Sequence, residues 1–302
     1  MTAYDPSKWT SHLFDIEGSM VREIMGRVAL CVAWATAVVA LYDYGPAFFD
    51  KLAIAETAHA MIGPSLGLLL VFRTNSSYDR FWEGRKQWGS IINECRNLAR
   101  QAETWFAADR QFANTFIRWT IAFAFATMHR LRGEQTIGAS KLGLESGEVA
   151  AVQQNRHVPL AVARKLTMMM SDAQQRGVID AIQLRSLDQN VQLLVDYCGA
   201  CERIKSTPAP YGYVVHLRRA LIIYCLTLPL ALVQRYGWET IPATLIISYV
   251  LFGIEEIGVE IENPFDRTIN DLPLEGLCET INLDLHSLIP GQLALTDVRP
   301  EE

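Results

Sequence analysis

The sequence lacks several short motifs that mark common enzyme classes. It has no P-loop, no HExxH and no GxGxxG motif, and its six histidines form no i,i+4 pair that could bind a metal from one helix face. We therefore expect no enzymatic activity and no cofactor. The six cysteines show no framework spacing, which favours a reducing compartment. The net charge of −6 gives no support for a nucleic-acid partner.

Charge is also scarce along the chain. Charged residues make up 20% of the 302 residues and apolar residues 50%, and the mean hydropathy is +0.11. This value is high for a soluble protein and low for one that lies wholly in lipid. The composition excludes disordered, collagenous and small disulfide-rich classes. It indicates membrane spans together with a sizeable water-facing part.

Four apolar stretches are long enough, or nearly so, to cross a bilayer, which takes about 20 mostly apolar residues. They lie at 28–44, 52–72, 220–233 and 241–257. The alternative, buried helices of a soluble protein, would require 302 residues to cover four such runs. Charged residues precede the first run and no small-residue cleavage site follows it, so we expect a retained span and not a signal peptide.

The placement of Lys and Arg predicts the orientation. Of the 27 Lys and Arg residues, only Lys51 and Arg235 fall in the two short loops between paired spans. Because Lys and Arg favour the cytoplasmic side, we expect a multi-pass protein of the cell (inner) membrane with both termini cytoplasmic. The expected segments are a cytosolic N-terminus, two spans, a cytosolic helical region, two further spans and a cytosolic C-terminus: 1–27, 28–72, 73–217, 218–262 and 263–302.

Helical spacing of apolar residues runs through the middle segment. It predicts helices at 78–106, 110–131, 160–175 and 179–205, with a glycine-containing loop at 133–147. No strand pattern occurs, so the fold class is all-α. The apolar stretch 119–131 resembles a span, but the polar residues around it favour a buried core helix. Cys198 and Cys201 have redox-motif spacing, yet they lie inside a helical pattern, so packing is the favoured role.

The second span carries the most informative side chains. Glu56 and His59 are i,i+3 neighbours, and ionisable residues inside a membrane usually face a bundle interior or a water-filled path. Pro64, Leu68 and Phe72 follow at i, i+4 and i+8. If several copies surround an axis, this stripe forms a narrow apolar ring that can gate ions by dewetting. Spacing alone favours the alternative, ordinary lipid or helix packing.

Two longer motifs carry a family resemblance. Residues 72–89 read FRTNSSYDRFWEGRKQWG and residues 261–274 read IENPFDRTINDLPL; Cys201-Glu-Arg and Thr207-Pro-Ala-Pro-Tyr211 accompany them. These motifs resemble the prokaryotic members of the bestrophin family, and the order of elements is similar over nearly the whole chain. The resemblance implies an all-α membrane protein with four transmembrane helices and a cytosolic helical block. It further implies a homopentamer in the lipid bilayer, assembled around a central pore for inorganic ions.

The resemblance also implies roles for single residues. Phe72, Leu68 and Pro64 correspond to the pore neck, although Pro64 replaces the usual aliphatic residue and predicts a different outer edge. Ile182 is the candidate for a second apolar constriction, the cytosolic aperture. The sign of the permeating ion would then depend on wider vestibules, for which the candidates are Glu56, His59 and Arg73, because an apolar neck does not select by charge.

Calcium activation is not expected. Animal bestrophins bind calcium through an acidic run after the Asn-Pro-Phe turn, whereas this chain has Asp266-Arg-Thr-Ile-Asn270-Asp271 there. Calcium takes six to eight oxygen ligands, so Asn270 and Asp271 are weak candidates, and they fit better as caps or interface ties.

The family favours a passive chloride-conducting channel. Alternatives are a cation-selective channel of the same fold, a non-conducting scaffold, and a membrane enzyme that uses Cys198 and Cys201.

Overall fold

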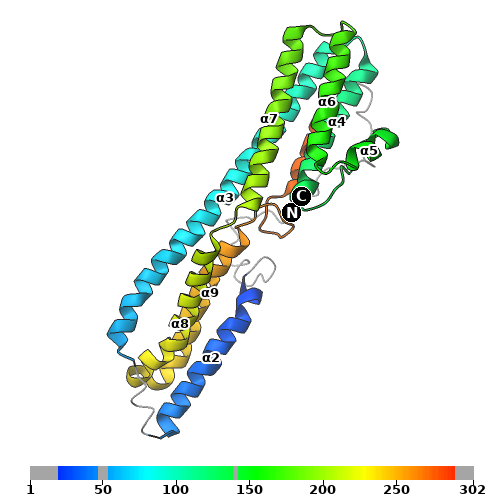
Figure 1. Cartoon of the computed structure of the whole chain (residues 1–302). Helices are drawn as coiled ribbons and strands as arrows, with labels where there is room; N and C mark the ends of the chain where they lie inside the picture. Colours follow the sequence, from blue (N-terminus) through cyan, green and yellow to red (C-terminus); the bar gives the residue numbers. More distant parts are fainter. Residues whose placement is uncertain (1–19, 47–53, 139–141, 290–302) are drawn as a thin grey trace. The chain divides into compact units, whose positions relative to one another are not determined.

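The computed structural model describes residues 20–46, 54–138 and 142–289 (Figure 1). Every regular element within these ranges is helical, which confirms the all-α prediction for the described part of the chain. The chain divides into two compact units. Unit 1 contains the described residues up to 81 together with 208–263 and 268–270; unit 2 contains 82–207, 264–267 and 271–289.

Unit 1 is a bundle of long apolar helices. It comprises α2 (Val21–Tyr44), the first part of α3 (Glu56–Trp105), α8 (Tyr211–Tyr236) and α9 (Thr240–Glu260). In Figure 1, α2 lies beside α8 and α9. The buried core is formed by one face of each helix and contains Ile24, Val28, Cys31, Leu66, Leu70, Leu217, Leu221, Cys225 and Phe252. The remaining apolar faces stay exposed, as expected for helices that meet lipid or another chain.

The helices α8 and α9 form one helical hairpin. A single 3-10 turn, η3 (Gly237–Glu239), joins them, and Gly237 has a φ of +50°, a region that favours glycine. By length and apolar content, two helical runs in the described part could cross a membrane: α2 and the 50-residue run Tyr211–Glu260. Since about 20 residues cross once, that run is long enough for both the third and the fourth expected span.

The second expected span, 52–72, overlaps the first part of α3, which begins at Glu56. Residues 52–53 lie outside the described residues, and the first part of α3 does not pass the same test of length and composition. The helix expected at 78–106 is confirmed over nearly its whole length, but it begins earlier, because α3 runs unbroken from Glu56 to Trp105. No Pro or Gly occurs at 73–77, and the Ser77 hydroxyl donates to the Gly258 carbonyl of α9 at 2.6 Å, which fixes this stretch as helix.

Unit 2 packs around α4 (Arg110–Leu131). Its neighbours are α6 (Val158–Gln175), α7 (Ala181–Ser206) and α10 (Leu274–His286), and the second part of α3 belongs to the same unit. Trp119, Ile121 and Phe123 are fully buried, so the expectation that 119–131 is a core helix and not a span is confirmed.

Helix ends in unit 2 follow local capping rules. The Asp109 side chain accepts from the Phe112 amide at 3.0 Å at the start of α4. The short helix α5 (Ser146–Gln153) was not predicted, and its start overlaps the expected loop 133–147. Val149 and Val152 of α5 are buried in the unit, a tertiary contact that the loop composition does not reveal.

Candidate functional site

In unit 1, two faces of α3 differ sharply in how far their side chains are exposed. Leu66 and Leu70 are 3% and 1% exposed and belong to the core. Pro64 is exposed, and Leu68 and Phe72 are 55% and 57% exposed. The expected neck residues therefore share the surface of the single chain. This apolar stripe lacks a partner within the described unit, so it is free to meet lipid or another chain.

Arg73 follows Phe72 directly and points the other way. Its side chain is 2% exposed, and Nη2 lies 2.5 Å from a carboxylate oxygen of Glu262. The other carboxylate oxygen accepts from the Ala209 amide at 2.7 Å, and the Glu262 carbonyl accepts from Arg80 Nε at 3.1 Å. Burial opposes ionisation, but the Arg73 guanidinium and the Ala209 amide outweigh it and lower the pKa of Glu262. Glu262 thus ties α3 to the start of α8.

The start of α3 is held to α8 by Glu56. Both carboxylate oxygens lie 3.2 Å from Nη1 of Arg235, and the Arg235 side chain is 67% exposed. The charge of Glu56 is thereby balanced by a neighbour in the same unit. Exposed pairs of this kind contribute about 0–1 kcal/mol, so the pair orients the helix end more than it stabilises it.

His59 lies in a small polar cluster between α3 and α8. It is 5% exposed, its ring stacks on Tyr224 with 4.1 Å between centroids, and Nε2 lies 3.2 Å from the Tyr224 carbonyl and 3.1 Å from Thr227 Oγ1. Because a carbonyl only accepts, Nε2 carries the proton in that bond. A Cβ on Gly63 would meet the Tyr224 hydroxyl at 3.0 Å, so Gly63 allows the close approach that its small size predicts.

A network of charged side chains lies near the C-terminal end of α9, and the sequence did not predict that its members contact one another. Glu255, 3% exposed, lies 2.8 Å from Arg218 Nε and 3.4 Å from Arg27 Nη1, and Glu256 lies 2.7 Å from Arg27. The carboxylates sit on α9 and the arginines on α8 and α2, so the network joins three helices. The sequence signal is the adjacent acidic pair at the end of an apolar run, but its partners are distant in the chain.

Ile182 is the most exposed large apolar residue of α7. It is 80% exposed and lies in the first turn of the helix. Asp180 and Gln183 form a capping box there: the Asp180 carboxylate accepts from the Gln183 amide at 2.7 Å, and the Gln183 side chain accepts from the Asp180 amide at 2.9 Å. The cap fixes the direction of the first turn and hence of Ile182.

The cysteine pair on α7 has the character of packing residues. Cys198 and Cys201 are 2% and 0% exposed. Burial raises the pKa of the Cys198 thiol to about 12 and also raises that of Cys201, so both are protonated near neutral pH.

Ser65 stands in Gly-Pro-Ser-Leu-Gly, a formal GxSxG match, but it lies inside α3 and not at the strand-to-helix turn that makes this motif reactive.

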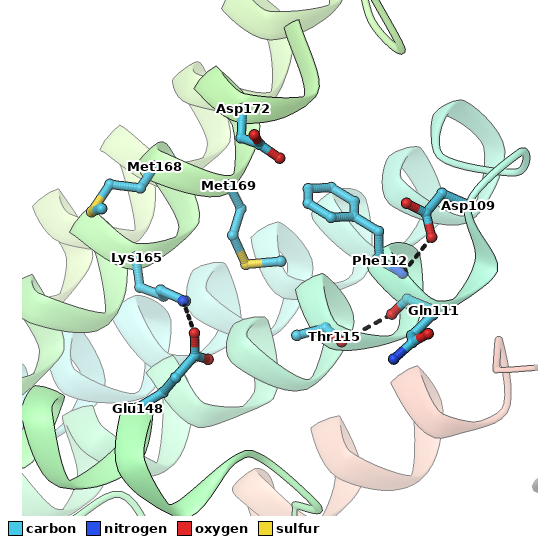
Figure 2. A pocket seen from close by; sticks show the side chains of 9 residues that line it. All are labelled: Asp109, Gln111, Phe112, Thr115, Glu148, Lys165, Met168, Met169 and Asp172. Carbon is cyan, nitrogen blue, oxygen red and sulfur yellow. Dashed lines mark hydrogen bonds and ion pairs between the residues drawn. The ribbon is translucent and has the colours of Figure 1, made fainter. Parts of the chain in front are cut away.

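A cleft of unit 2 with a volume of about 480 Å³ lies between α4, α5 and α6 (Figure 2). Its charged groups are mostly engaged with neighbours. Lys165 pairs with Glu148, and Arg176 lies 3.2 Å from Asp109 and 2.9 Å from Asp172. The lining contains no serine, cysteine or histidine, and its one hydroxyl, that of Thr115, donates to the Gln111 carbonyl at 2.9 Å.

The calcium candidates lie after the second motif. Asp271 is 9% exposed and belongs to unit 2, whereas Asn270 is half-buried and belongs to unit 1. Among the residues described, no group of three or more His, Cys, Asp or Glu side chains is arranged to hold a metal ion.

Comparison with known proteins places the chain in a family. The family model of bacterial and fungal bestrophin proteins matches residues 1–287. The chain is 38% identical over 292 residues to a voltage-dependent anion channel-forming protein of Nostoc sp., covering 94% of this chain and 93% of that one. A protein of the same description from Synechocystis sp. is 37% identical over 290 residues, covering 94% and 92% of the two chains.

A solved structure matches the fold. The crystal structure of a bacterial bestrophin homolog from Klebsiella pneumoniae superposes with a TM-score of 0.82 at 26% identity, covering 88% of this chain and 98% of that one. The motifs at 72–89 and 261–274, the helix order and both comparisons agree. The protein is an all-α membrane protein with the bestrophin fold, and its chain belongs to the bacterial and fungal bestrophin family.

Proposed function

We propose that the protein is not an enzyme but forms a homopentameric channel that conducts anions, chloride among them, without energy input. The observation that carries the proposal is the exposed apolar stripe of Pro64, Leu68 and Phe72 on α3. Relatives 38% and 37% identical over more than nine-tenths of the chain are described as anion channel-forming proteins. Five copies of the stripe around an axis form a narrow neck.

The neck restricts flow by its size and its lack of polar groups. Water and ions leave a narrow apolar constriction readily, so small changes in width open or close it. Phe72 has the largest side chain of the three and forms the tightest ring. Pro64 is compact, so the outer ring is wider. Ile182, exposed and fixed by the α7 cap, forms a second constriction.

The buried side of α3 sets the direction of this stripe. Arg73 is held by Glu262, Glu56 by Arg235, and His59 by the α8 backbone. These contacts prevent rotation of α3 about its own axis. We assign the three residues to positioning the neck, whereas the neck side chains meet the ions.

The membrane arrangement follows from charge and length. Helix α2, the first part of α3, α8 and α9 are the four crossings of the cell (inner) membrane, with both termini and the middle region cytoplasmic. The distribution of Lys and Arg supports this orientation, and the 50-residue run Tyr211–Glu260 supports a double crossing by α8 and α9.

The test is electrical. Purified wild-type protein and a Phe72→Ala variant are placed in planar bilayers under a tenfold KCl gradient. We expect a reversal potential near the chloride equilibrium value, and a larger, less gated conductance for Phe72→Ala. Ile246→Ala is the matched control, because Ile246 is also exposed, at 62%, but lies on α9 and not on the stripe of α3. Native mass spectrometry should detect five copies.

Other outcomes would select other functions. Reversal near the potassium value would favour a cation channel of the same fold. No current from any of the three proteins would contradict the neck and favour a scaffold, and a partner bound by the cytosolic helical region should then co-purify. A membrane enzyme that uses Cys198 requires a reactive thiol, which the burial of this side chain disfavours.

A further inference from the structure

The exposed stripe of α3 changes character just beyond Phe72. Pro64, Leu68 and Phe72 are apolar, and the next exposed positions toward the C-terminus of the stripe are Asn75, Ser76 and Asp79. Seven residues make about two helical turns, so Asp79 returns to within about 20° of the direction of Phe72. It lies about 10 Å farther along the axis, at 1.5 Å per residue. Asp79 is thus the first charged side chain on the stripe after the neck.

Asp79 differs from three other acidic residues of unit 1 in having no arginine partner among the described residues. Glu56, Glu255 and Glu262 each pair with an arginine. Asp79 is exposed, and no hydrogen bond or ion pair engages its side chain within the described part of the chain. Its charge is therefore not balanced by a neighbour in its own unit. The neighbouring Arg80 is directed elsewhere, since its Nε donates to the Glu262 carbonyl.

We infer that Asp79 is a specificity-determining residue that lowers the preference of the channel for anions over cations. The inference rests on the proposed pentameric pore. Five copies of the stripe then place a ring of five carboxylates about 10 Å from the Phe72 ring. An apolar neck discriminates by size and dewetting and not by charge sign. The first charged ring beside it therefore has a direct influence on which sign of ion enters.

The size of the effect follows from electrostatics. Charge rings in confined vestibules produce potentials of the order of kT or more. When the electrostatic energy of a monovalent ion changes by one kT, the local concentration of ions of one charge sign rises about 2.7-fold and that of the opposite sign falls by the same factor. The ratio of anions to cations then changes about sevenfold. Removing the ring should therefore raise the chloride-to-potassium permeability ratio by about three- to tenfold. The ring acts through a screened field, so its effect must also depend on salt.

The experiment compares reversal potentials of full-length channels in KCl gradients. Asp79→Asn should raise the chloride-to-potassium permeability ratio, Asp79→Lys should raise it further, and Asp79→Glu should keep the wild-type value. Glu145→Gln is the matched control, because it removes one exposed carboxylate per chain, without a partner among the described residues, from the start of α5 and should leave the ratio unchanged. An unchanged ratio in a conducting Asp79→Asn channel would overturn the inference while leaving the proposed channel intact.

A second measurement needs no variant. The Debye length falls from about 10 Å at 0.1 M salt to about 3 Å at 1 M, so the ring is screened at high salt. The permeability ratio of the wild-type channel should rise over this range. A ratio independent of salt, or an Asp79→Glu channel that shifts as far as Asp79→Asn, would refute the role of the charge. Absence of current from the wild-type protein would instead refute the proposed function itself.

Discussion

Two arginine–carboxylate pairs of equal length but different burial allow a direct test of what holds α3 in place. Arg73 and Glu262 lie 2.5 Å apart, with side chains 2% and 17% exposed. Arg96 and Asp284 also lie 2.5 Å apart, but their side chains are 49% and 40% exposed. If burial controls the cost of breaking a pair, Glu262→Gln must destabilise the protein far more than Asp284→Asn.

The magnitudes follow from the environment of each arginine. Glu262→Gln keeps an oxygen for the Ala209 amide but removes the charge facing Arg73. The guanidinium then remains buried without a counter-charge, and its Nε and Nη1 already have no acceptor in the described structure. Removing one partner of a buried pair lowers the free energy of unfolding by about 3–5 kcal/mol. Because the glutamine of this variant would keep the contact with the Ala209 amide, we expect a loss at the lower end of this range, about 3 kcal/mol. Loss of the exposed pair should cost about 0–1 kcal/mol.

The effect of Glu262→Gln should also depend on pH. Because the folded protein lowers the pKa of Glu262 below its ordinary value of 4.5, the ionised carboxylate stabilises the fold. This contribution is complete above the ordinary value and is lost as the pH falls through the lower folded value. The wild-type protein and Glu262→Gln should therefore differ at pH 7 and converge in acid.

The assay is thermal unfolding of detergent-purified protein at one scan rate, at pH 7 and at stepwise lower pH. The double variant Arg73→Met/Glu262→Leu removes both charges and should be more stable than Glu262→Gln alone, since no unpaired buried charge remains. Equal losses for Glu262→Gln and Asp284→Asn would refute the reasoning from burial. A double variant no more stable than the single one would show that the charge of Arg73 is not the cause.

Three further outcomes can be checked with the same protein. Gly84→Ala should lower stability by about 1–3 kcal/mol, because its Cβ would meet Phe265 at 3.1 Å, whereas Gly199→Ala has open space and should stabilise by up to about 1 kcal/mol in urea unfolding. Cys198, with its pKa raised to about 12, should resist maleimide at pH 7 until the protein is unfolded; rapid native labelling would contradict its burial. Asp180→Ala should cost about 1 kcal/mol by loss of the α7 cap, and no change in melting temperature would refute that role.

Local pattern was sufficient to predict most helices. The expected helix at 110–131 coincides with α4, and the expected helix at 160–175 lies within α6, because each has an apolar stripe and a capping residue that act over a few residues. The start of the helix expected at 78–106 was placed too late for the complementary reason, since α3 already begins at Glu56. Polar residues at a membrane exit resemble a loop locally, but Ser77 and Arg73 have partners on and just after α9.

The sequence did not predict which distant side chains pair with the residues of the candidate site. Arg73 and Glu262 are separated by 189 residues, and the Glu56–Arg235 pair by 179. Nothing in the spacing of one segment indicates which distant side chain will meet it. The family resemblance identified Phe72 and its neighbours as residues of interest, but only the folded unit distinguishes the exposed stripe from the buried one.

That distinction has a physical consequence for the assembly. A helix that is apolar on all sides is normally buried, and the first part of α3 is apolar on both its packed and its exposed face. Leu66 and Leu70 are covered within unit 1, whereas Leu68 and Phe72 are more than half exposed. Water cannot be the stable environment of the second pair without a cost of about 1.5–3 kcal/mol per side chain. The buried Arg73–Glu262 pair next to Phe72 fixes which of the two faces of α3 points away from unit 1. The proposed pore needs both features, an apolar stripe at its neck and a helix that cannot turn about its own axis.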